Sequence, residues 1–138
     1  MTRDNARVHI AAEVVLGDQA LRAAHELLRL GLLHDAVSRA YYAALHFAQA
    51  LLLTEGVEPK THHGVSAMLG LHFVMPGKLT AERSKELARL EQFRGEADYN
   101  RFFVLPPEGA AEEVVVADRF VEALRSVLEH GGWIGPSG

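Results

Sequence analysis

The chain has 138 residues, of which 49% are hydrophobic and 23% are charged, and this balance suits one soluble domain with a single core. The formal net charge of −4 argues against a broad, non-specific nucleic-acid surface, although it leaves room for a small local basic site. The absence of cysteine excludes disulfides, thiolate metal sites and cysteine nucleophiles.

The first predicted element is a helix that ends at Gly31, because glycine favours the conformation that terminates helices. Gly17 lies inside this segment and weakens the prediction of one unbroken helix. The helix face is indicated by apolar or small residues at steps of three and four, namely Ile10, Val14, Gly17, Leu21, Ala24 and Leu28.

The second predicted helix runs from about Asp35 to Glu55. It is rich in alanine, leucine and aromatic residues and is apolar around most of its circumference. A helix of this kind is surrounded by others, so we expect it at the centre of a bundle. Gly56 and Pro59 end it.

The third and fourth predicted helices are separated by Pro76 and Gly77. Residues 61–74 form a short third helix. The fourth begins after Thr80, whose hydroxyl suits an N-cap. The prolines at 106–107 must end or interrupt it, since proline lacks the amide hydrogen that a helix interior needs.

The fifth predicted helix covers residues 108–130, and we expect a loose tail over residues 132–138. The three valines at 114–116 are too few for a strand, and their charged neighbours fit a helix better. The elements together predict an all-α fold, an up-and-down helical bundle of four to five helices built as a single domain over residues 1–138.

The sequence carries no targeting signal that we recognise. Residues 1–5 lack the apolar run of a signal peptide, and no stretch reaches the roughly 18 apolar residues that a membrane span needs. We therefore expect a cytoplasmic protein without membrane contact.

Arg39 and Tyr42 lie three residues apart in the second helix and are therefore surface neighbours. Burying an arginine is unfavourable unless it is paired, so Arg39 either pairs with a carboxylate of another helix or faces a cleft. In a cleft it would bind an anion, because a guanidinium suits phosphate and a nearby tyrosine can stack on a base.

The fourth helix carries Arg94, Gly95, Asp98 and Tyr99. Arg94 and Asp98 are four residues apart and can form an ion pair along the helix. Asp98 is expected to pair with Arg94 or with Arg39. Gly95 costs roughly 1 kcal/mol in a helix interior relative to alanine, which predicts close approach by another helix or by a ligand.

The start of the third helix is a further candidate for phosphate binding. Thr61 can cap the helix, whose first amides are free to bind an anion, and Lys60 and His62 would add positive charge. The chain has eight histidines, but none has the spacing of a known metal-binding motif, so we predict neither a metal site nor a cofactor.

Four segments of the chain resemble, in the same order, elements of a prokaryotic subgroup of the HEPN domain family. They are Asp35–Ala44 (DAVSRAYYAA), Lys60–Gly64 (KTHHG), Leu71–Val74 (LHFV) and Arg94–Tyr99 (RGEADY). The resemblance covers about residues 5–130. It implies an up-and-down helical bundle that forms a homodimer and pairs with a small nucleotidyltransferase, often as a toxin–antitoxin system.

The resemblance also implies a catalytic role that this sequence departs from. Some HEPN domains are metal-independent ribonucleases that use an arginine and a histidine with four to six residues between them. Here Tyr99 or Arg101 stands at that position, and His130 lies far away on another helix. Imidazole exchanges protons near pH 7, whereas a phenol ordinarily does not.

These observations lead to three alternative functions. The first is a binding module that dimerises, docks a nucleotidyltransferase and holds a nucleotide or RNA phosphate. Its ligand-binding candidates are Arg39, Tyr42, Lys60, His62 and Arg94. The second is a variant ribonuclease toxin that lacks the usual histidine and has Arg94, Asp98 and Tyr99 as catalytic candidates. The third is a structural helical protein whose arginines only stabilise the fold.

Overall fold

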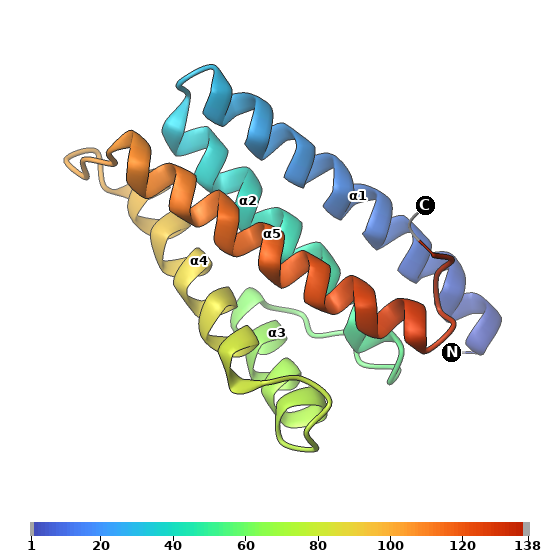
Figure 1. Cartoon of the computed structure of the whole chain (residues 1–138). Coiled ribbons are helices and arrows are strands. Elements are labelled where there is room, and N and C mark those ends of the chain that lie inside the picture. The colour runs from blue at the N-terminus through green and yellow to red at the C-terminus, as the bar shows by residue number, and fades with distance from the viewer. Residues whose placement is uncertain (1, 137–138) are drawn as a thin grey trace.

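The computed structural model describes residues 2–136, which form five α-helices and one π-helical turn (Figure 1). The elements are α1 (Arg3–Arg29), α2 (Leu33–Leu53), α3 (His62–Leu69), η1 (Gly70–Val74), α4 (Ala81–Tyr99) and α5 (Pro107–His130). Figure 1 shows the four long helices running alternately up and down, with α3 and η1 in the connection between α2 and α4. The predicted all-α bundle is confirmed.

Helix α2 lies at the centre of the bundle, as its composition predicts. It packs against α1, α3, α4 and α5. Many of its residues are buried alanines, which let neighbouring helices approach closely. Its Tyr41, Phe47, Leu51 and Leu52 are among the largest fully buried side chains, so the hydrophobic core is built around α2.

Helix α1 is unbroken in spite of Gly17. This glycine is buried against α2, and a Cβ atom added to it would lie 2.6 Å from the ring of Phe47. The missing side chain therefore makes room for that ring. Gly31, with a φ of +77°, follows the helix in the left-handed conformation, as predicted.

The connections around α4 differ in detail from the prediction. The predicted helix over residues 61–74 is divided into α3 and the π-helical turn η1. Helix α4 ends at Tyr99, well before the prolines at 106–107. Beyond it, the side chain of Asn100 accepts a hydrogen bond from the backbone N–H of Phe102 at 3.1 Å and so shapes the turn that follows.

Ion pairs between buried glutamates and more exposed arginines connect α4 to α5. Arg89 of α4 donates two hydrogen bonds, at 2.6 and 2.9 Å, to Oε2 of Glu113, a completely buried residue of α5. Glu86 of α4 is almost as buried and lies 3.0 Å from Arg83 and 3.7 Å from Arg119. Burial raises the pKa of Glu113 and of Glu86 above the ordinary value of 4.5, and the arginines offset only part of this effect.

The beginning of the predicted loose tail is packed. Trp133 and Ile134 are partly buried against the core, and the guanidinium of Arg3 stacks 3.9 Å from the Trp133 ring. The tail is thus held by apolar contact and a cation–π interaction that its glycine-rich sequence does not indicate. Residues 137–138 lie outside the described part of the chain. No helix within residues 2–136 has the length and hydropathy needed to span a membrane.

Candidate functional site

Polar and aromatic side chains of three helices meet in what we call the arginine–tyrosine cluster. It comprises Ser38, Arg39, Tyr41 and Tyr42 of α2, His62 of α3, and Arg94, Asp98 and Tyr99 of α4. These segments are up to 60 residues apart in the chain and are joined by the packing of α3 and α4 on α2. Six of the residues are site candidates from the sequence.

Arg94 lies at the middle of the cluster, among three tyrosine rings. Its Cζ atom is 5.0 Å from the ring centroid of Tyr41, 5.9 Å from that of Tyr42 and 5.7 Å from that of Tyr99. The side chain is only 12% exposed, and Nη1 lies 3.4 Å from the Tyr99 hydroxyl. Burial lowers the pKa of Arg94, but the tyrosines outweigh this effect and leave the pKa raised. The group is a fixed positive charge.

Arg39 has a different environment. It is exposed, and its Cζ atom lies 4.8 Å from the centroid of the Tyr42 ring. Within residues 2–136 it forms no ion pair, so the interpretation that Arg39 pairs with a carboxylate of another helix is wrong. The position of Arg39 on the solvent side of α2 removes the need for a partner, because its charge stays hydrated.

Tyr41 belongs to the cluster although the sequence did not identify it as a site residue. It is 1% exposed, and burial together with the negative charge of Glu91 raises the pKa of Tyr41 to about 12. Its hydroxyl therefore keeps its proton at neutral pH. The only signal in the sequence is its place beside Tyr42, and in an apolar helix that predicts burial rather than function.

His62 reaches the cluster from the first turn of α3. Its ring centroid is 5.7 Å from that of Tyr41 and 6.0 Å from that of Tyr42. Thr61 caps the helix as predicted, by accepting a hydrogen bond from the backbone N–H of Gly64 at 2.9 Å. Lys60 is exposed, and within residues 2–136 it forms no hydrogen bond or ion pair, so its contribution to the cluster remains a prediction.

Asp98 is the acidic member of the cluster. Its Oδ2 lies 3.8 Å from Nη1 of Arg94, which confirms the expected pairing along α4, and it accepts a 3.5 Å hydrogen bond from Ser38 of α2. Gly95 is not the helix-crossing point that its position suggested. A Cβ atom added to it would meet nothing within 4 Å, so the space beside it is open.

The cluster has the chemistry of an anion site. Two guanidinium groups face one aromatic ring, and the carboxylate of Asp98 lies 3.8 Å from Arg94, beyond hydrogen-bonding distance. Guanidinium groups bind phosphate through paired hydrogen bonds, and an exposed aromatic ring such as that of Tyr99 can stack on a base. Within residues 2–136, no three histidine, aspartate or glutamate side chains are grouped so that they could hold a metal ion.

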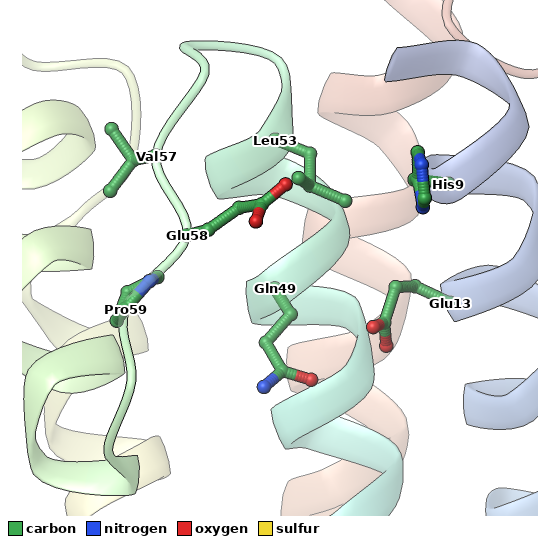
Figure 2. A pocket seen from close by; sticks show the side chains of 7 residues that line it. All are labelled: His9, Glu13, Gln49, Leu53, Val57, Glu58 and Pro59. Carbon is green, nitrogen blue, oxygen red and sulfur yellow. The ribbon is translucent and has the colours of Figure 1, made fainter. Parts of the chain in front are cut away.

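A separate cavity of about 280 Å³ lies between α1, α2 and the loop that leads to α3 (Figure 2). Two carboxylates, those of Glu13 and Glu58, line it together with His9 and Gln49. The two carboxylates make this lining unfavourable for an anion. The cavity shares no residue with the arginine–tyrosine cluster.

Comparison with known proteins gives a consistent family assignment. The sequence model of the HEPN domain matches residues 17–129. "Putative toxin MJ0605" of Methanocaldococcus jannaschii is 37% identical over 124 residues, covering 89% of this chain and 91% of that protein. A "UPF0332 protein" of Thermotoga maritima is 32% identical over 80% of this chain and 84% of its own length. "Putative toxin MJ0142", also of Methanocaldococcus jannaschii, is 31% identical over 67% of this chain and 63% of its own length.

Proposed function

This chain belongs to the HEPN domain family, and from that premise we propose that it is a toxin-like module that binds the phosphate of a nucleotide or an RNA at the arginine–tyrosine cluster. In this proposal the module acts in the cytoplasm as a homodimer and pairs with a small nucleotidyltransferase. The names of two archaeal relatives contain the word toxin, which supports the general class.

The observation that carries the proposal is the convergence of Arg39 and Arg94 on the ring of Tyr42. Arg94 is mostly buried among tyrosine rings, whereas Arg39 is exposed and has no acidic partner within residues 2–136. The only ion pair that either arginine forms within residues 2–136 is the one between Arg94 and Asp98, at 3.8 Å. An exposed guanidinium beside a mostly buried one is suited to hold an anion that approaches from solvent.

Binding is tested directly with the purified chain. We expect a labelled single-stranded RNA to bind in fluorescence anisotropy, with an affinity that falls as salt increases because each phosphate contact releases counterions. Calorimetric titration with AMP and ATP measures nucleotide binding in the same buffer. Binding of neither RNA nor nucleotide at low salt would contradict the proposed function.

The partner part of the proposal rests on family membership, since HEPN proteins are commonly encoded beside a small nucleotidyltransferase. Co-expression with the nucleotidyltransferase encoded nearest to this chain should give a complex that survives size-exclusion chromatography. Light scattering of the chain alone should give twice the mass of one 15.1 kDa chain. Failure to recover the complex would contradict the proposed nucleotidyltransferase partner. It would not bear on phosphate binding, which the RNA and nucleotide titrations test.

A second candidate, a variant ribonuclease toxin, is favoured by the contact between Arg94 and Tyr99. The Tyr99 hydroxyl lies 3.4 Å from Nη1 of Arg94, at the place in the sequence where ribonucleases of this family have a histidine. Expression of the chain should then arrest growth, and Arg94→Ala should abolish the arrest in a protein that still folds. Intact RNA after incubation with the purified dimer would argue against this candidate.

A further inference from the structure

We propose that His62, supplied by helix α3, is the group that accepts the proton when RNA bound at the arginine–tyrosine cluster is cleaved. The inference rests on the proposed binding of RNA phosphate at this cluster. It assigns the proton transfer to a residue outside α4, the helix on which the family's catalytic arginine and histidine are expected. It thus names the catalytic base for the second candidate function, the variant ribonuclease.

The position of His62 distinguishes it from the other histidines. His25 is hydrogen-bonded to Asp118, His46 to Glu13 and His130 to the backbone of Ser126. His62 instead lies against the rings of Tyr41 and Tyr42, the same two rings that contact the guanidinium of Arg94. Within residues 2–136 its imidazole nitrogens have no hydrogen-bond partner, and the side chain is half-buried, so a substrate hydroxyl can reach it.

The other candidates for this role are poorer proton acceptors. Tyr41 is 1% exposed, and its raised pKa of about 12 keeps its hydroxyl protonated at neutral pH. Tyr99 is 80% exposed, but a phenol is a weak base until it ionises, which ordinarily needs a pH near 10. Imidazole is the side chain that both accepts and returns a proton near neutral pH.

The reaction is a transesterification within the RNA. His62 takes the proton from a ribose 2′-hydroxyl, and the 2′-oxygen forms a bond to the adjacent phosphorus. The bond between phosphorus and the 5′-oxygen breaks, and this oxygen takes a proton from solvent. The products are a 2′,3′-cyclic phosphate and a free 5′-hydroxyl, and His62 then returns its proton to solvent. Arg94 stabilises the negative charge that develops on the phosphate oxygens, while Arg39 holds a neighbouring phosphate.

The test compares two adjacent histidines of the same helix turn. The full chain, His62→Gln and His63→Gln are incubated with a labelled single-stranded RNA of mixed sequence and with tRNA, and the ends of the products are identified. We expect the native chain and His63→Gln to produce 2′,3′-cyclic phosphate ends. We expect the cleavage rate at saturating RNA to fall by at least about 100-fold in His62→Gln. A 2′-O-methyl RNA should bind but stay intact.

A second variant excludes a general effect on folding. In His62→Ala, added imidazole should restore part of the cleavage, because the free base can occupy the space of the lost ring. The proposal is overturned if His62→Gln cleaves as the native chain does, or if the native chain binds both RNAs without cleaving them. In the latter case the binding function stands. If the native chain does not bind RNA at all, the RNA-binding part of the proposed function fails first, and the inference fails with it.

Discussion

Arg39 and Arg94 approach the same aromatic ring from two different helices. Their Cζ atoms lie 4.8 and 5.9 Å from the centroid of the Tyr42 ring. Arg94 is held by surrounding tyrosines, whereas the side chain of Arg39 is free to turn toward solvent. An anion bound here would meet one charge that is already in place and another that can close over it.

Replacing Arg39 should weaken binding and leave the fold intact. Because Arg39 is exposed, Arg39→Ala should change the free energy of unfolding by less than about 0.5 kcal/mol. If Arg39 contacts one phosphate, the slope of log affinity for RNA against log salt concentration should fall by about one. Fluorescence anisotropy at several salt concentrations measures the slope, and Arg22→Ala, which removes an exposed arginine of α1, is the matched control. Equal slopes in the two variants would place the phosphate elsewhere.

Replacing Arg94 by lysine should separate charge from geometry. Lysine keeps the positive charge, but its ammonium cannot lie flat against tyrosine rings or form paired hydrogen bonds. We expect Arg94→Lys to bind RNA about tenfold more weakly, which corresponds to one charged hydrogen bond of about 1.4 kcal/mol. Thermal unfolding of the same protein checks that the bundle is intact. Full affinity in this variant would show that a simple point charge is enough.

The helices and their buried faces could be predicted from the sequence because apolar periodicity reports directly which side of a helix faces the core. The surroundings of polar residues could not be predicted in this way. For Arg39 the sequence leaves both an ion pair with another helix and a place in a cleft open, and the side chain is exposed without an ion pair within residues 2–136. For Gly95 it leaves both a helix and a ligand open, and no other helix within residues 2–136 comes within 4 Å of a Cβ atom added there. Both depend on how α3 and α4 are placed on α2, which is a long-range property. Trp133 shows the same limit, since its contact with Arg3 joins the two ends of the chain.

Loss of Arg89 should strongly destabilise the fold at neutral pH. Arg89→Ala leaves Glu113 completely buried without its hydrogen-bond donor, and removing one partner of a buried ion pair costs about 3–5 kcal/mol. Chemical denaturation at pH 7 measures this loss. The neighbouring Glu112 is exposed, so Glu112→Ala should stay within about 0.5 kcal/mol of the native chain. A similar small effect for both variants would mean that water reaches Glu113.

Glu86 should make stability depend on pH in a defined direction. Its pKa in the folded state is raised above the ordinary value of 4.5, so the folded chain holds this proton more tightly than the unfolded chain does. The resulting stabilisation is present below about pH 4.5 and is lost as pH rises through the folded pKa. In Glu86→Gln this titration is absent. The free energy of unfolding of the variant, relative to the native chain, should therefore increase from pH 4 to pH 7.

Denaturation curves at several pH values measure the dependence on Glu86. Glu122→Gln, at an exposed position of α5, gives the baseline for removing a carboxylate. A difference between Glu86→Gln and the native chain that shrinks as pH rises would show that Arg83 and Arg119 outweigh the effect of burial.

The same substitution at two helical glycines should have opposite effects. Gly17→Ala puts a methyl group 2.6 Å from the buried ring of Phe47, and such overpacking costs about 1–3 kcal/mol, more than the roughly 1 kcal/mol gained in helix propensity. Gly95→Ala meets no atom within 4 Å and should stabilise the monomer by up to about 1 kcal/mol. The melting temperatures of the two variants, compared with that of the native chain, measure these opposite effects. A loss of the dimer in Gly95→Ala would show that a second chain occupies the open space.

The contact between Arg3 and Trp133 brings the beginning of α1 and the segment after α5 together at one corner of the bundle, as Figure 1 also shows. A short peptide could join these points, and new ends could be opened at the exposed turn of Pro76 and Gly77 without cutting a helix. Leu53, the last residue of α2, lies at the same corner as Arg3 and Trp133, and Arg39 is 14 residues before it, about 21 Å along the helix axis. Because the arrangement of the two arginines depends on helix packing, we expect a circularly permuted chain to keep it.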